Sequence, residues 1–297
     1  MLKTLRPASQ RGTISTTIQR NDSSPFARGL HAWYAAGHRM SNGSVVWRDL
    51  SINSYDLTLQ NAASIDYAGA WKSKRRGVMP VYMNQIDQTV QTWWEGEDNA
   101  LNVNGWQCIT WSMWVNWNNT ANNNPSTPYD EVVITRARSY QGTFGFMRNR
   151  GDHLTKAYIY TSMGLHADFS STTLDDDTWY LTTVVYDGVN LITYIDGVNI
   201  HEMAVTGGQP LSLADTSTSL IVGSGSWGGS ADNKVGASFD DIRVYNRPLA
   251  ASEVMKLYRE TRGGGYGSLA SPSRLRLASV GAATSAQTGK SFLLFID

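Results

Sequence analysis

Residues 179–197 read Trp179-Tyr-Leu-Thr-Thr-Val-Val-Tyr186, Asp187-Gly-Val-Asn190, Leu191-Ile-Thr-Tyr-Ile195 and Asp196-Gly197. The first run alternates bulky side chains with small or hydroxylated ones, which is typical of a β-strand with one buried face. Asp-Gly tolerates the left-handed backbone conformation of a tight hairpin turn. The two Asp-Gly pairs therefore predict that these runs form a β-meander.

A further strand and a helix follow the meander toward the C-terminus. The predicted strand is Ser238-Phe-Asp-Asp-Ile-Arg-Val-Tyr-Asn-Arg247. The helix is predicted over residues 251–260, because Val254, Leu257 and Tyr258 recur at the spacing of one helical face. We expect that face to pack against a sheet.

Three shorter motifs lie on the N-terminal side: Gly29-Leu-His-Ala-Trp-Tyr34, Trp47-Arg-Asp-Leu-Ser51 and Ile109-Thr-Trp-Ser-Met-Trp-Val115. Together with the C-terminal motifs, they make residues 29–260 resemble the laminin-G-like branch of the concanavalin A-like lectin/glucanase superfamily. The resemblance implies an all-β fold. The expected architecture is an antiparallel β-sandwich (jelly roll) with one short C-terminal helix.

The resemblance also implies two local features. Relatives usually have Ser at the helix N-cap, where this chain has Ala250, so we expect the capping box with Glu253 to be lost and the helix to fray or begin at Ser252. Relatives often hold a structural Ca²⁺, and Asp49 and Asp240 match its ligand positions. Alternatively, Asp49 caps a turn and Asp240 pairs with an arginine. No cofactor is required in either case.

The composition agrees with one large β-domain. The chain has 297 residues, of which 41% are hydrophobic and 11% aromatic, so a single sandwich can bury a large core. The single cysteine, Cys108, excludes an internal disulfide. Trp114 alternates with Ser112 and Asn116, and we predict that it points into the core.

The net charge is zero, but basic residues gather at the two ends. Residues 1–28 hold five Lys/Arg and one Asp, and residues 256–297 hold six Lys/Arg and two acids, which leaves 14 basic and 22 acidic residues between them. We predict a basic N-terminal arm (1–28), a sandwich domain (29–260), and a Gly-rich linker with a basic and apolar C-terminal arm (261–297). The candidate assembly residues of the C-terminal arm are Arg274, Arg276, Phe292, Leu293, Leu294, Phe295 and Ile296.

The acidic residues argue against catalysis. A retaining glycosidase needs two carboxyl groups about 5–5.5 Å apart, which alternate positions of one strand can supply. Of the six glutamates, none begins a Glu-x-Asp motif that reaches a second Glu at strand spacing. The nearest match, Glu95-Gly-Glu97-Asp98, lies in a stretch that we interpret as an acidic loop. We therefore expect no enzymatic activity and assign no catalytic residue.

Binding through aromatic side chains fits the composition better. Sugar recognition on β-sandwiches uses an exposed aromatic ring beside polar groups, and several aromatic residues fall in segments interpreted as loops. The candidates for carbohydrate binding are Trp93, Trp94, Tyr140 and Trp227, with Tyr129 as a further loop aromatic. Each of them could instead pack within its loop or against another subunit.

Three classes of function are consistent with these features. We favour a virion structural protein, a capsid decoration or tail adhesion module with weak glycan binding, because Pro25-Phe-Ala-Arg-Gly-Leu30 resembles the start of stand-alone laminin-G-like proteins of bacteriophages. The alternatives are a cellular carbohydrate-binding module and, less favoured, a diverged glycosidase. Residues 1–12 lack the apolar core of a signal peptide, so we expect synthesis in a host cytoplasm and incorporation into a virion.

The arms predict the partners. We expect them to contact other virion proteins, with assembly into a homo-oligomer and a host-surface glycan as a further ligand. The acidic body disfavours the binding of nucleic acid. The sequence contains no run of 18 apolar residues, so we expect no membrane insertion.

Overall fold

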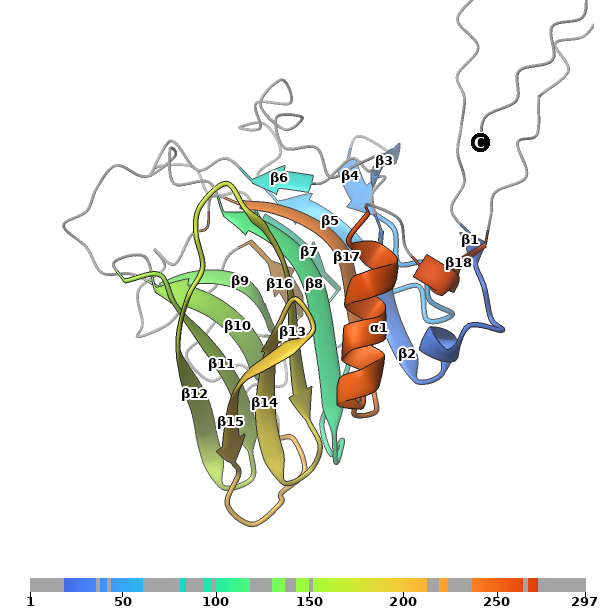
Figure 1. Cartoon of the computed structure of the whole chain (residues 1–297). Helices are drawn as coiled ribbons and strands as arrows, with labels where there is room; N and C mark the ends of the chain where they lie inside the picture. Colours follow the sequence, from blue (N-terminus) through green and yellow to red (C-terminus); the bar gives the residue numbers. More distant parts are fainter. Residues whose placement is uncertain are drawn as a thin grey trace, which may run out of the picture.

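Two antiparallel β-sheets pack face to face in the computed structural model (Figure 1). The structure describes residues 19–35, 38–41, 44–60, 81–83, 93–97, 100–117, 130–136, 143–149, 152–212, 219–223, 235, 237–263 and 267–271. The predicted all-β jelly roll with one short helix is confirmed.

One sheet has nine strands. In spatial order they are β12 (Gly164–Thr173), β11 (Leu154–Thr161), β10 (Phe144–Asn149), β9 (Asp130–Arg136), β16 (Leu220–Val222), β7 (Trp93–Gly96), β5 (Leu57–Gln60), β4 (Ser44–Trp47) and β3 (His38–Ser41).

The other sheet has seven strands. They are β15 (Val198–Ala204), β14 (Asn190–Ile195), β13 (Trp179–Tyr186), β8 (Ile109–Trp117), β17 (Ala237–Tyr245) and β2 (Leu30–Tyr34), with β6 (Val81–Met83) paired to β17. The short elements outside both sheets are β1 (Gln19–Arg20), β18 (Ala270–Ser271), η2 (Pro25–Ala27), η5 (Gly267–Leu269) and α1 (Ala251–Thr261).

The predicted meander is confirmed as β13, β14 and β15. Its first turn is held by Asp187, whose Oδ1 accepts hydrogen bonds from the backbone N–H groups of Val189 and Asn190 at 2.8 and 2.7 Å. Asp196 and Gly197 have φ of +53° and +82°. These are the two left-handed positions that a tight primed turn requires, which is why Asp-Gly predicted the hairpin correctly.

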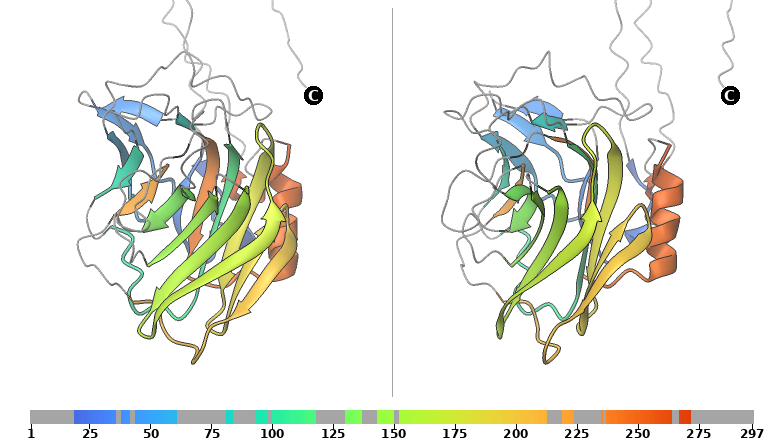
Figure 2. Two further views of the ribbon diagram at one scale, coloured as in Figure 1. Left: turned by 90° about the vertical axis from the view of Figure 1, so that its left-hand side faces the viewer. Right: turned by 60° about the vertical axis from the view of Figure 1, so that its left-hand side comes forward.

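The main core lies between the two sheets (Figure 2). Strand β8 contributes Trp111, Met113, Val115 and Trp117 to it. Trp114 is buried in the core as predicted, but in a second cluster, which lies on the outer face of the seven-stranded sheet. Residues two apart share a face of a strand, so Trp114 lies on the face opposite to that of Trp111 and Met113.

Helix α1 covers this outer face (Figure 2). Val254 and Leu257 are buried and Tyr258 packs against them, as the helical spacing predicted. Trp114 Nε1 donates a hydrogen bond to Thr261 Oγ1 at 2.9 Å. The helix therefore covers Trp114, which would otherwise be exposed on the outer face of the sheet.

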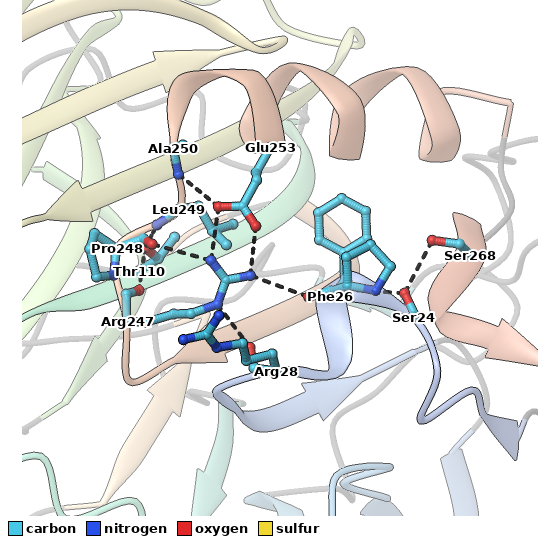
Figure 3. Close-up of polar contacts among 11 residues, drawn as sticks. Ser24, Phe26, Arg28, Thr110, Arg247, Pro248, Leu249, Ala250, Glu253 and Ser268 are labelled. Carbon is cyan, nitrogen blue, oxygen red and sulfur yellow. Dashed lines mark hydrogen bonds and ion pairs between the residues drawn. The ribbon is translucent and has the colours of Figure 1, made fainter.

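The helix begins at Ala251, so the expectation of a shift to Ser252 was wrong. Glu253 keeps half of the capping box, since its Oε2 accepts a hydrogen bond from the Ala250 N–H at 2.9 Å. The Arg247 guanidinium donates to both oxygens of Glu253 at 2.8 Å (Figure 3). The hydrogen bonds from Arg247 are the main cause of a lowered Glu253 pKa. The ion pair thus compensates for the missing N-cap side chain.

The two ends of the described chain are joined to each other. Strands β1 and β18 pair antiparallel, with Gln19 opposite Ser271. Ser24 Oγ and Ser268 Oγ lie 3.1 Å apart, and Phe26 is buried under α1 (Figure 3). The packed structure thus extends beyond both predicted boundaries, 28/29 and 260/261, because the two end segments pair with each other.

Candidate functional site

The structure tests the location of two predicted aromatic residues. Trp93 and Trp94 lie in strand β7 between β5 and β16, with Trp94 opposite Leu59 and Val222, so their interpretation as loop residues was wrong. The aromatic run simply continues the strand into Glu95. The remaining aromatic and assembly candidates lie outside the described residues: Tyr129, Tyr140, Trp227, Arg274, Arg276, Phe292, Leu293, Leu294, Phe295 and Ile296.

Asp49 is a hydrogen-bond acceptor that covers the free edge of β2. Its Oδ1 accepts from the backbone N–H groups of Trp33 and Ser51, both at 2.8 Å. Its Oδ2 accepts from Ser51 Oγ at 2.7 Å and from the Tyr55 N–H at 2.9 Å. The His31 carbonyl accepts from Ser51 Oγ and Asn53 Nδ2. Side chains of the 49–53 loop therefore form hydrogen bonds with backbone groups of β2 that an edge strand would otherwise present to another chain.

Asp240 is buried in β17. A bulge between Asp240 and Arg243 places the neighbouring Asp241 at φ +51°. The pairing of Asp240 itself with an arginine stays a prediction. Arg243 Nη2 donates to Asp241 Oδ2 at 2.7 Å. Within the described residues no group of three or more His, Cys, Asp or Glu side chains could hold a metal ion. Calcium at Asp49 and Asp240 stays a prediction.

The glutamates of the nine-stranded sheet make structural contacts. Glu95 was expected in an acidic loop, but it is a buried residue of β7 that accepts a hydrogen bond from Ser219 Oγ at 3.0 Å. Glu131 Oε2 accepts from Nη2 of Arg148 at 2.7 Å, and both side chains are buried. Both carboxylates are thus buried and hydrogen-bonded within the fold.

A His-Asp pair joins the edges of the two sheets. His201 Nδ1 on β15 contacts Asp168 Oδ1 on β12, and Thr193 Oγ1 donates to Asp168 Oδ2 at 3.1 Å. Burial raises the pKa of Asp168, and His201 and Thr193 oppose the effect. A nucleophilic triad needs the hydroxyl hydrogen-bonded to the imidazole that takes its proton. Here the hydroxyl binds the carboxylate, so the geometry is that of a cross-sheet link.

The structure also assembles an aromatic cluster at the surface, which we call the Trp106 cluster and define as His31, Tyr55 and Trp106. The His31 and Trp106 rings meet edge to face with centroids 4.7 Å apart, and the His31 and Tyr55 centroids are 6.1 Å apart. All three side chains are partly exposed. Trp106 and Tyr55 also pack against the main core. The cluster is therefore anchored from below and open on one side.

The sequence offered little sign of this cluster. His31 is the second residue of β2, Tyr55 precedes β5, and Trp106 precedes β8. A signal did exist at Trp106, since Asn104-Gly105 marks a turn directly before it. Nothing local to that turn shows that the beginnings of β2 and β5 meet it.

The family model described as the concanavalin A-like lectin/glucanases superfamily matches residues 89–255. A comparison with curated proteins finds no match. Among solved structures, the binding domain of Paraclostridial mosquitocidal protein 1 aligns at 15% identity and a TM-score of 0.54, covering 77% of this chain and 52% of that one. At this identity the likeness shows the fold alone.

Two botulinum neurotoxin structures align in the same way. A type C toxin, whose cell entry depends on two ganglioside molecules, has 9% identity and a TM-score of 0.55, with 80% of this chain and 53% of that one covered. The binding domain of toxin DC, solved with rat synaptotagmin II, has 8% identity and a TM-score of 0.54, with 78% and 51% covered. The chain thus spans about half the length of these structures. With more than half of its own length matched by the family model, the chain belongs to the concanavalin A-like lectin/glucanase superfamily.

Proposed function

We propose that the protein is a non-enzymatic glycan-binding module that is carried on a bacteriophage virion as a capsid decoration or tail adhesion protein. The observation that carries the binding role is the partly exposed Trp106 cluster on a lectin-like sandwich. The engagement of Glu95 and Glu131 by the fold supports the non-enzymatic part of the proposal. The neurotoxin structures named above support the binding role by analogy, because one acts through gangliosides and a further neurotoxin binding domain was solved with N-acetylneuraminic acid.

The pairing of β1 with β18 supports the attachment role. Gln19 lies opposite Ser271, so the predicted arm residues 1–18 and 272–297 join the domain at neighbouring points. The first segment holds three Lys/Arg and no acid, and the second holds three Lys/Arg and one Asp. Two basic segments with one point of departure can act together on the same partner. We infer that they hold the domain in a homo-oligomer and on other virion proteins.

Binding without turnover is the expected result for the isolated protein. A glycan array should give a weak signal with purified protein and a stronger one with particles that display many copies, because multivalency raises avidity without new contacts. The array eluates should contain no released sugar by mass spectrometry. Hydrolysis products would contradict the non-enzymatic role, and an absence of binding in both formats would contradict the glycan role.

Removal of residues 1–18 and 272–297 should abolish assembly and leave the domain folded. Both deletions stop outside β1 and β18, so all the described strands and the helix are retained. Analytical ultracentrifugation would measure the oligomer, and mass spectrometry of purified particles would test incorporation. A larger deletion, of residues 264–297, is the control. It also removes Ser268, which forms hydrogen bonds with Asn21 and Ser24. A truncated domain that still assembles would contradict the role of the arms.

A further inference from the structure

We propose that the Trp106 cluster is the glycan-binding site and that it binds one neutral pyranose unit. This inference rests on the proposed function and names its site and ligand class. The three side chains are far apart in the sequence, and none of them is among the aromatic candidates predicted at 93–94, 140 and 227.

The surface beside the tryptophan is open. Gly105 has φ +79°, and a Cβ built on it meets no atom within 4 Å. Gly105, Asn104 and Gln107 are exposed around the partly exposed Trp106. An aromatic ring that is anchored on a core and open on one side can stack against the C–H groups of a sugar. The removal of apolar surface from water then stabilises the contact.

Hydrogen-bonding groups surround the rings. Among the described residues, no hydrogen bond involves Trp106 Nε1, the Tyr55 hydroxyl, or either ring nitrogen of His31. Asn53 uses its Nδ2 on the His31 carbonyl, at 2.7 Å, and leaves its Oδ1 for another donor. The cluster and Asn53, which is hydrogen-bonded to it, thus supply both donors and acceptors. A sugar hydroxyl, which both donates and accepts, matches this pattern.

The charges favour a neutral ligand. Both carboxylate oxygens of Asp49 already accept hydrogen bonds from β2 and the 49–55 loop, so this carboxylate is not assigned to the sugar. Burial lowers the pKa of His31, and Asp49 only partly opposes this. The lowered pKa favours the neutral imidazole, which offers one N–H and one lone pair. The three described residues that form the cluster include no Lys or Arg that could pair with the carboxylate of an acidic sugar.

The site is held in place before a ligand arrives. The Gly105 N–H donates to the Leu211 carbonyl and the Leu211 N–H donates to the Trp106 carbonyl, both at 2.8 Å. The His31 backbone is held by Ser51 and Asn53. A preorganised site loses little conformational entropy on binding. Even a shallow contact with one sugar can then be specific.

The test compares the full-length protein with its Trp106→Ala variant on an array of neutral hexose and N-acetylhexosamine glycans and their sialylated counterparts. Replacement of the ring should weaken binding to the neutral glycans by about tenfold or more, which corresponds to about 1.4 kcal/mol, because it removes the apolar surface on which the sugar stacks. Trp179→Ala is the matched control. Trp179 is also a partly buried tryptophan, but it packs against the second core cluster, which lies under α1 and contains Trp114.

Tyr55→Phe provides a second variant that is expected to fold, because no described residue bonds the hydroxyl that it removes. It should weaken binding by a few-fold with an unchanged thermal midpoint, and the Trp106 indole N–H resonance should shift on addition of the glycan to wild-type protein. Wild-type binding that survives Trp106→Ala, or that is confined to sialylated glycans, overturns this site and leaves the proposed function standing. A wild-type protein that binds no glycan overturns both.

Discussion

Replacement of Arg243 by Met should lower the free energy of unfolding by about 3–5 kcal/mol, the cost of leaving one member of a buried ion pair without its partner. Arg243 and Asp241 are both 1% exposed and are joined by two hydrogen bonds of 2.8 and 2.7 Å. Asp241 would keep only the bond from Trp33 Nε1. Burial alone would lower the pKa of Arg243, but the charge and hydrogen-bond interactions with Asp241 and Tyr245 together outweigh it, and the pKa is raised.

Urea unfolding followed by tryptophan fluorescence measures this loss. Arg48→Met is the matched control, because Arg48 pairs with Asp56 at 2.9 Å but its side chain is 52% exposed. An exposed pair contributes at most about 1 kcal/mol. The double variant Arg243→Met with Asp241→Asn should recover part of the stability, since Asn carries no charge and tolerates the left-handed backbone of this position. Equal midpoints for the Arg243 and Arg48 variants would contradict a structural role for the buried pair.

Replacement of Asp49 by Ala should destabilise the protein by about 2–4 kcal/mol, because the backbone N–H groups of Trp33, Ser51 and Tyr55 lose their acceptor, and that of Trp33 is buried. The variant should also self-associate. Loss of the carboxylate uncovers the edge of β2, and an exposed strand edge can pair with another chain.

Size-exclusion chromatography with light scattering would detect the self-association, and urea unfolding the destabilisation. Asp187→Ala is the control, since Asp187 also accepts from two backbone N–H groups but lies in an exposed turn. Its cost should be about 1 kcal/mol or less, in the range of an ordinary turn or cap hydrogen bond. A monomeric Asp49 variant with wild-type stability would contradict the role assigned to the 49–53 loop.

Several features of the fold follow from short-range patterns. The Asp-Gly pairs at 187–188 and 196–197 predict their hairpins because few residue types adopt the required backbone angles. The spacing of Val254 and Leu257 predicts the buried face of α1 because the helical repeat alone places them together. In each case the residues that decide the outcome are within a few positions of one another.

The candidate site depends on long-range packing instead. His31, Tyr55 and Trp106 stand at the beginnings of three strands, and only the pairing order of the two sheets brings those beginnings together. The same is true of Trp114, which is buried because α1, far along the chain, covers the outer face of β8. Alternation along a strand shows which residues share a face, but not what covers it. That information lies in the tertiary contacts, because each covering element is supplied by a distant part of the chain.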